Sequence, residues 1–133
     1  MYVKLAYLHG VLDEGIYMEQ PEGFIAKGDK NKVCRLVQSL YGLKQAGRVW
    51  NRTFAHTIKK KLGFTTTHSD AGVYVLHRHH KRGDSDMYMI LILYVDNPLL
   101  LGEDLSKIKD IKCQLGKLYQ MKDPGPASSY LGI

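Results

Sequence analysis

The chain has 133 residues, a length that predicts one domain, or part of a larger one, with a hydrophobic core of its own. With 44% hydrophobic and 24% charged residues and a net charge of +6, the composition is that of a globular protein and not of a disordered one. The longest apolar run, Met87–Val95, is far shorter than the about 20 residues of a membrane-spanning helix. We therefore expect no membrane association.

The first third of the chain predicts short strands joined by loops. Apolar residues over Val3–Leu8 predict a short, mostly buried strand, and His9–Glu14 reads as a turn or loop. Gln20–Gly23 carries a proline and a glycine and predicts a turn, followed by a polar loop over Lys27–Lys32. Alternating β-branched residues over Val33–Val37 predict a second strand.

The clearest predicted helix covers Lys44–Leu62. Its apolar residues recur every four positions and form one slowly rotating face, while basic side chains lie on the opposite side. Gly63 is a typical helix C-terminal stop, and Gly47 weakens the pattern by about 0.5–1 kcal/mol relative to alanine. The apolar face comprises Ala46, Trp50, Phe54, Ile58 and Leu62.

The second half of the chain predicts a strand over Val73–Leu76, followed by a hairpin. Asp86–Val95 is almost continuously apolar and predicts a strand buried on both faces. Asp96–Asn97 predicts a tight turn, with Leu99–Leu101 as the returning strand. Pro98 removes one hydrogen-bond donor from that strand.

The loop His77–Gly83 contains three histidines, which either lie in solvent or bind a metal, although no Cys or carboxylate stands at ligand spacing.

Asp104–Tyr119 predicts an amphipathic helix with Asp104 as its N-cap. Two prolines make Met121–Ser129 irregular, and Tyr130–Ile133 reads as the start of a strand. The predicted apolar stripe of the helix comprises Leu105, Ile108, Ile111, Leu115 and Leu118.

Together these elements predict an α+β fold, with a small, mostly antiparallel sheet and two packing helices. The two cysteines, Cys34 and Cys113, predict no disulfide framework, and the first residues do not resemble a secretory signal. We therefore expect an intracellular protein, either cytoplasmic or nuclear.

The positive charge is concentrated in one stretch. Residues 27–61, here called the basic segment, carry ten Lys and Arg against Asp29 alone, a net charge of 10 − 1 = +9. Residues 1–26 have a net charge of 1 − 4 = −3, and residues 62–133 of 8 − 8 = 0. The segment is either a binding surface for a polyanion such as RNA or DNA, or an ordinary solvated surface.

Five motifs occur in order along the chain. They are Ile16–Phe24, Ser39–Ala46 with Arg48 and Trp50, Tyr94-Val95-Asp96, Met121-Lys122-Asp123 and Tyr130–Ile133. In this order and at this spacing, they resemble the reverse transcriptase domain of copia-type (Ty1-like) retrotransposon polyproteins. The resemblance covers residues 1–133 and implies a partial, truncated polymerase palm. It also implies that the upstream fingers, the thumb and the RNase H domain are missing.

The resemblance implies phosphoryl transfer with two Mg²⁺ ions, which need clustered carboxylates as ligands. The family places one aspartate on its first palm strand and two adjacent aspartates in a Tyr-X-Asp-Asp hairpin turn. Here Tyr2 stands at the first position and Asn97 at the last, so Asp96 remains as the catalytic and metal-binding carboxylate. These substitutions predict weak or absent Mg²⁺ binding and a catalytically inactive domain.

Other positions match the family. Tyr7 stands where the family carries an aromatic beneath the sugar of the incoming nucleotide, although a core aromatic is the plain alternative. Lys44, Gln45, Arg48 and Arg52 lie in the stretch that resembles the region near the template and nucleotide, although a solvated helix face explains them equally well. Trp50, on the apolar stripe, is predicted to be core.

Three hypotheses follow. The first is a retrotransposon-derived reverse transcriptase domain that is catalytically inactive. The second is a repurposed nucleic-acid-binding module that uses the basic segment. The third is a protein-interaction module, since a truncated palm exposes sheet edges and apolar surface that favour self-association or a protein partner.

Overall fold

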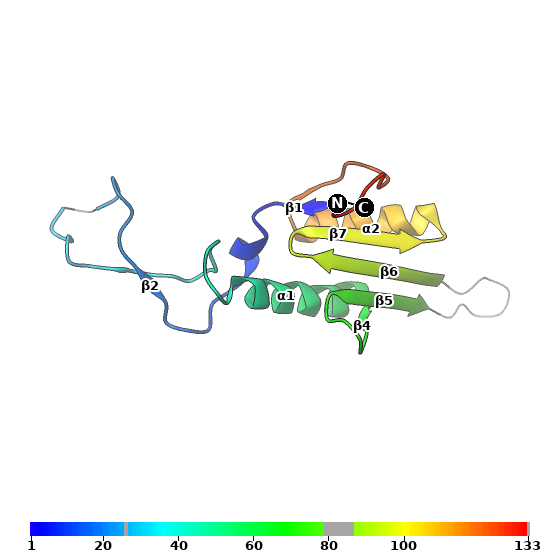
Figure 1. Ribbon diagram of the computed structural model, residues 1–133, viewed down its shortest axis with the longest axis horizontal. Helices are drawn as coiled ribbons and strands as arrows, with labels where there is room; N and C mark the ends of the chain where they lie inside the picture. The colour runs from blue at the N-terminus through cyan, green and yellow to red at the C-terminus, as the bar shows by residue number, and fades with distance from the viewer. Residues whose placement is uncertain (26, 79–86, 133) are drawn as a thin grey trace. The chain divides into compact units, whose positions relative to one another are not determined.

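The computed structural model describes residues 1–25, 27–78 and 87–132 (Figure 1). The chain divides into two compact units. The sheet unit comprises Met1–Ala6 and Phe54–Ile133, and the arm unit comprises Tyr7–Thr53. The predicted α+β class is confirmed, because the described elements are antiparallel strand pairs and two main helices.

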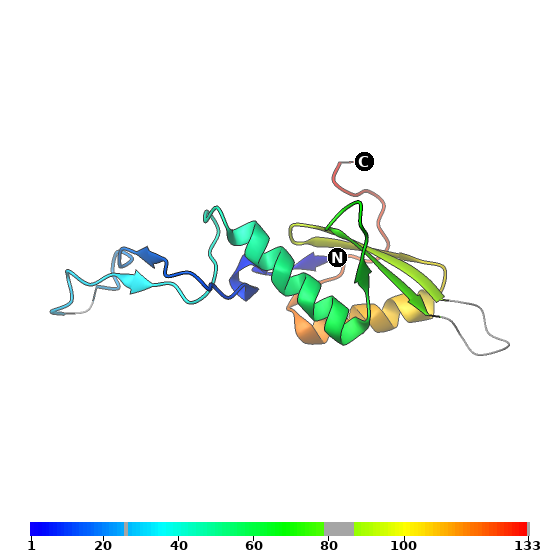
Figure 2. The same ribbon diagram turned by 90° about the horizontal axis from the view of Figure 1, so that it is seen from below.

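The sheet unit is built on four antiparallel strands in the order β4-β5-β6-β7. Their bounds are Thr65–Thr66, Val73–Arg78, Met87–Tyr94 and Asn97–Gly102. Residues on β6 alternate between buried and partly exposed, so the prediction of a strand buried on both faces is wrong. The reason is the antiparallel arrangement, in which one face packs on the core and the other faces solvent. Figure 2 shows α2 on one side of the sheet and the C-terminal segment on the other.

The helix α2, Leu105–Leu118, begins at the predicted N-cap. Asp104 Oδ1 accepts hydrogen bonds from the backbone N–H of Ser106 at 2.8 Å and of Lys107 at 3.3 Å. Ile111 and Leu115 of the predicted stripe are buried, whereas Leu105 is 72% exposed. The predicted apolar stripe is therefore buried at Ile111 and Leu115, whereas its first residue, Leu105, faces solvent.

The strand β1, Tyr2–Val3, pairs antiparallel with β8, Met121–Lys122. The predicted strand over Val3–Leu8 is wrong beyond its start, because Leu5 has a φ of 54° and the chain turns into a 3-10 helix at Ala6–His9. A left-handed residue cannot continue a strand. The predicted strand at Tyr130 is also wrong for the described residues, since Leu131 is left-handed too.

The predicted long helix is confirmed as α1, Ala46–Thr57, followed by a π-helical turn at Ile58–Leu62. It starts two residues later than predicted, and Gly63 ends it with a φ of 78°, as expected of a left-handed glycine stop. The five residues of its predicted apolar face are all buried.

The arm unit contains a two-stranded hairpin of β2, Tyr17–Met18, and β3, Cys34–Arg35. The predicted strand over Val33–Val37 is thus confirmed only at Cys34–Arg35, and the sequence did not predict β2. The predicted turn after Gln20 is confirmed, since the Phe24 N–H donates to Pro21 O at 3.0 Å. No helix in the described part of the chain is long and apolar enough to cross a membrane.

Candidate functional site

The candidate site begins at the β6–β7 hairpin of the sheet unit. Tyr94 pairs with Asn97, so the two-residue turn is Val95–Asp96, one residue earlier than predicted. Val95 has a φ of 53°, a conformation that β-branched residues rarely adopt and that stores about 1–2 kcal/mol of strain. The half-buried Asp96 thus lies at the tip of the hairpin, and Asn97 is the first residue of β7.

The strand β1 runs alongside this turn. The Met1 amino group donates to Pro98 O at 3.1 Å, and the Val3 N–H donates to Asp96 O at 2.7 Å. From Met1 to Val3 the donor advances by two residues, while the acceptor goes back by two residues, from Pro98 to Asp96. The two segments are therefore antiparallel. This register places Tyr2 directly opposite Asn97. Two of the three positions at which the family resemblance expects aspartates therefore face each other here, with Asp96 next to Asn97.

The side chains at this site do not fit a magnesium ion. Asp96 is the carboxylate at the turn, and its Oδ1 already accepts a hydrogen bond from Asn97 Nδ2 at 3.0 Å. Tyr2 supplies a phenol and Asn97 a neutral amide, and neither compensates the charge of a divalent cation. Within residues 1–25, 27–78 and 87–132, no cluster of three or more His, Cys, Asp or Glu side chains could hold a metal.

The C-terminal segment also contacts this turn. The Tyr130 hydroxyl donates to Asn97 O at 2.8 Å, which sequence reasoning did not foresee because no local pattern links residues 33 positions apart. Burial raises the pKa of Tyr130 above its ordinary value. A cavity of about 540 Å³ lies next to this hydrogen bond, lined by residues of the C-terminal loop with Met1, Asn97 and Leu99.

Tyr7 belongs to the arm unit and lies on the 3-10 helix, not on the predicted strand. It is half-buried, and its ring packs at 4.6 Å, centroid to centroid, from that of Tyr41. Tyr7 thus meets the Ser39–Ala46 motif, although the predicted contact with a sugar stays a prediction. Trp50 is 1% exposed, which confirms that it is a core residue.

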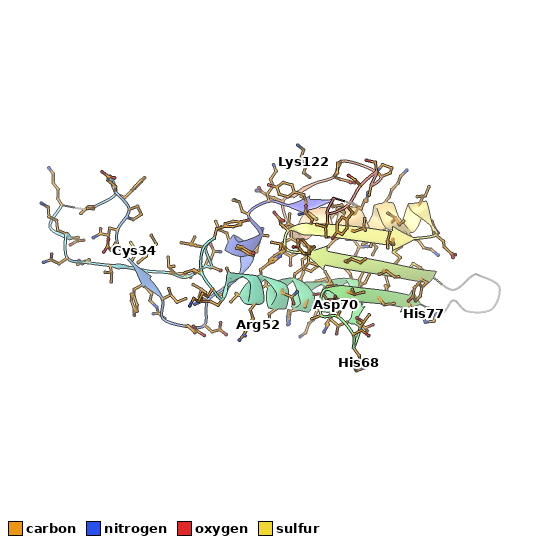
Figure 3. The ribbon with its side chains drawn as sticks, in the orientation of Figure 1. Cys34, Arg52, His68, Asp70, His77 and Lys122 are labelled. Carbon is orange, nitrogen blue, oxygen red and sulfur yellow. The ribbon has the colours of Figure 1, made fainter. Side chains whose placement is uncertain are left out.

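Of the other predicted contact residues, Lys44 and Gln45 lie just before α1, and Arg48 and Arg52 lie within it. Lys44, Arg48 and Arg52 are exposed, while Gln45 is half-buried and its carbonyl accepts the Val49 N–H at 2.9 Å. Arg52, labelled in Figure 3, makes two hydrogen bonds to the carboxylate of Asp13, at 2.9 and 2.8 Å.

The Arg52 hydrogen bond lowers the pKa of Asp13 below its ordinary value. Arg52 is therefore already engaged by a carboxylate and is a weaker candidate for a phosphate contact than Lys44 or Arg48. Sequence reasoning missed this ion pair, because its partners stand 39 residues apart with no local signal.

All ten cations of the basic segment are exposed. Lys32 is paired with Asp29 at 2.9 Å and Arg52 with Asp13, and both pairs lie at the surface. Residues 27–53 of the segment belong to the arm unit and residues 54–61 to the sheet unit. The predicted loop His77–Gly83 is wrong at its start, because His77 and Arg78 belong to β5, and residues 79–83 lie outside the described residues. The ring of His77 lies 6.0 Å, centroid to centroid, from that of Tyr88.

Comparison with known proteins identifies the family. The model of the reverse transcriptase (RNA-dependent DNA polymerase) family matches residues 1–133. The chain is 47% identical over 131 residues to the retrovirus-related Pol polyprotein from transposon TNT 1-94 of Nicotiana tabacum, covering 98% of the chain and 9% of that protein. It is 38% identical over 134 residues to a putative transposon Ty5-1 protein of Saccharomyces cerevisiae, covering 100% of the chain and 41% of that protein.

A third relative is the retrovirus-related Pol polyprotein from transposon RE1 of Arabidopsis thaliana, 39% identical over 98% of the chain and 8% of its own length. The chain thus spans between 8% and 41% of the length of these relatives. No solved structure matches the chain.

Proposed function

Because the chain belongs to the reverse transcriptase family, in its copia-type (Ty1-like) branch, we propose that residues 1–133 form a polymerase palm that does not catalyse DNA synthesis. The observation that carries this proposal is the pair Tyr2 and Asn97. These residues face each other beside Asp96, where the resemblance expects three carboxylates. One carboxylate cannot hold two divalent ions about 3.5–4 Å apart, the arrangement that phosphoryl transfer by such polymerases requires.

Primer extension on an RNA template tests this proposal. The purified chain is incubated with primer, deoxynucleotides and either Mg²⁺ or Mn²⁺, next to an active reverse transcriptase as a positive control. We expect no templated incorporation above the background of a reaction without protein. Incorporation that follows the template sequence would refute the proposal.

The exposure of the basic segment favours a second function, the binding of RNA or DNA. Eight of its ten cations have no carboxylate partner among the described residues, so they are available to phosphates. Contacts to three to five phosphates predict a log–log salt dependence of the binding constant of roughly −3 to −4.5.

A salt titration of duplex binding tests this second function. Lys44→Gln and Arg48→Gln should each make the slope shallower by about 1. Lys117→Gln, which neutralises an exposed lysine on α2 outside the segment, is the matched control. A flat salt dependence, or no binding at low salt, would exclude this function.

A further inference from the structure

One row of side chains crosses four neighbouring segments of the sheet unit. Tyr94 on β6 is paired with Asn97 on β7, and Tyr2 on β1 is paired with Lys122 on β8. The hydrogen bonds of Met1 and Val3 to the turn place Tyr2 opposite Asn97. Directly opposed residues of antiparallel strands lie on the same face. The row Tyr94–Asn97–Tyr2–Lys122, here called the turn row, therefore shares one face.

The turn row is accessible. Tyr94 is 56% exposed and Tyr2 is 39% exposed, and Lys122 extends away from the ribbon in Figure 3. Two phenol rings thus flank an amide, and a cation stands at one end. Lys4, exposed and two residues after Tyr2, adds a second cation near the same end.

We propose that the turn row is a metal-independent binding surface for single-stranded nucleic acid. Exposed aromatic rings stack on unpaired bases, and nearby lysines neutralise the backbone phosphates. Aspartates at positions 2 and 97 would repel those phosphates unless a cation stood between them. Tyr2 and Asn97 thus carry no charge, and Asp96, whose Oδ1 accepts from Asn97 Nδ2, is the carboxylate that stays at the turn, so the row needs no metal.

This inference is independent of the basic segment. Binding through the turn row depends mainly on aromatic stacking and involves the sheet unit alone. Binding through the basic segment depends on positive charge, most of which lies in the arm unit. It is also independent of the absence of catalysis, because it is measured without divalent ions.

Fluorescence anisotropy tests the proposal, with a short fluorescein-labelled oligothymidylate in EDTA at low salt and a duplex of equal length for comparison. We expect the single strand to bind more tightly than the duplex. Tyr2→Ala and Tyr94→Ala should each weaken single-strand binding by about tenfold, because each removes one stacking platform. Tyr2→Phe should retain binding, since the phenyl ring stacks as the phenol does.

Two further variants sharpen the test. Tyr2→Asp should bind more weakly than Tyr2→Ala, because it adds repulsion to the loss of stacking. Lys122→Gln should make the salt dependence shallower by about 1.

The matched control is Tyr88→Ala. Tyr88 is 52% exposed and lies on the same face of β6 as Tyr94, but six residues away, about 20 Å along the strand. Its removal should leave the affinity unchanged. Circular dichroism of each variant confirms that it is folded.

Several results would overturn the proposal. They are equal affinities of wild type, Tyr2→Ala and Tyr94→Ala, an equal loss in Tyr88→Ala, tighter binding of the duplex, or no binding in EDTA. Loss of binding only in Lys44→Gln and Arg48→Gln would assign the strand to the basic segment and would also refute the turn row. None of these results would bear on primer extension, so failure of this inference and failure of the proposed function are distinguishable.

Discussion

The sheet unit and the arm unit differ in how they use apolar side chains. In the sheet unit, a core of large apolar residues from the helices and the sheet is almost fully buried, among them Phe54, Ile58, Tyr74, Leu91 and Leu115. In the arm unit, many large apolar residues are mostly exposed. They are Val11, Tyr17, Phe24, Ile25, Val33, Val37 and Tyr41, with exposed fractions from 50% to 81%.

Most buried apolar side chains therefore lie in the sheet unit, whereas most cations of the basic segment lie in the arm unit. The strands of the arm hairpin are two residues long, whereas β6 has eight residues and α2 has fourteen. Burial of apolar area is the main source of folding free energy, so we expect stability to reside in the sheet unit. The arm unit carries seven of the ten cations of the basic segment and contributes surface more than core.

The largest expected effect is on the free energy of unfolding, and it tests whether stability resides in the sheet unit. Phe54 is fully buried, and its ring packs 5.6 Å from that of Tyr119 and 6.2 Å from that of Tyr74. Phe54→Ala should lower the free energy of unfolding by about 3–5 kcal/mol, through lost burial and the cavity left behind. The control Phe24→Ala removes the same atoms from an arm residue that is 81% exposed, and should change it by less than about 0.5 kcal/mol. Urea unfolding measures both, and similar losses in the two variants would contradict the comparison.

The sequence predicted the two main helices and the β6–β7 hairpin most completely. The long periodic stripe identified α1, the capping aspartate identified the start of α2, and the apolar runs around the turn identified the β6–β7 hairpin. These signals are local, because period, cap and turn residues are set within a few positions. The alternating burial of β6 was missed, because an all-apolar run does not show which face meets solvent.

The candidate site depended on information that no local pattern contains. The family resemblance singled out positions 2, 96 and 97, and the structure brings them together through the bonds of β1 to the turn. The left-handed Leu5, the β1–β8 pairing and the Asp13–Arg52 ion pair could not be foreseen. Each depends on residues that approach only after folding, or on a backbone conformation unusual for its residue type.

A smaller effect tests whether the arm unit is loosely packed throughout. A Cβ on Gly10 would lie 2.7 Å from Val49 Cγ1 and 3.3 Å from Tyr7 O, all within the arm unit. Gly10→Ala should therefore destabilise the protein by about 1–3 kcal/mol, since the stiff Val49 side chain must move. Gly116→Ala on α2 meets nothing within 4 Å and should stabilise by about 0.5–1 kcal/mol. Thermal unfolding measures the opposite signs, and a neutral Gly10→Ala would show that the arm lacks this tight contact.

Within the sheet unit, a double variant tests whether the backbone at the turn can bring three carboxylates together. Because Tyr2 faces Asn97 beside Asp96, the double variant Tyr2→Asp/Asn97→Asp should gather three carboxylates at the turn. At an effective dielectric constant of about 20, each carboxylate about 4 Å from a cation attracts it by several kcal/mol, so Mn²⁺ affinity should rise by at least about tenfold. Electron paramagnetic resonance of free Mn²⁺ measures this affinity without any polymerase assay. Equal binding by the variant and the wild type would show that the backbone at this turn does not bring the carboxylates together.

The smallest expected effect concerns the ion pair on the surface of the arm unit. Arg52→Gln removes the main cause of the lowered pKa of Asp13, so this pKa should return toward its ordinary value near 3.8. A carboxyl group with a lowered pKa in the folded state stabilises the fold above the unfolded-state pKa, and this contribution disappears as the pH falls through the folded-state pKa. The wild type and the variant should therefore differ most near neutral pH and converge in acid. Since both side chains are more than 60% exposed, the difference in unfolding midpoint should be barely measurable even at neutral pH. Carboxyl-carbon NMR titration reports the pKa directly, and an unchanged Asp13 pKa in Arg52→Gln would show that the two side chains are not paired in solution.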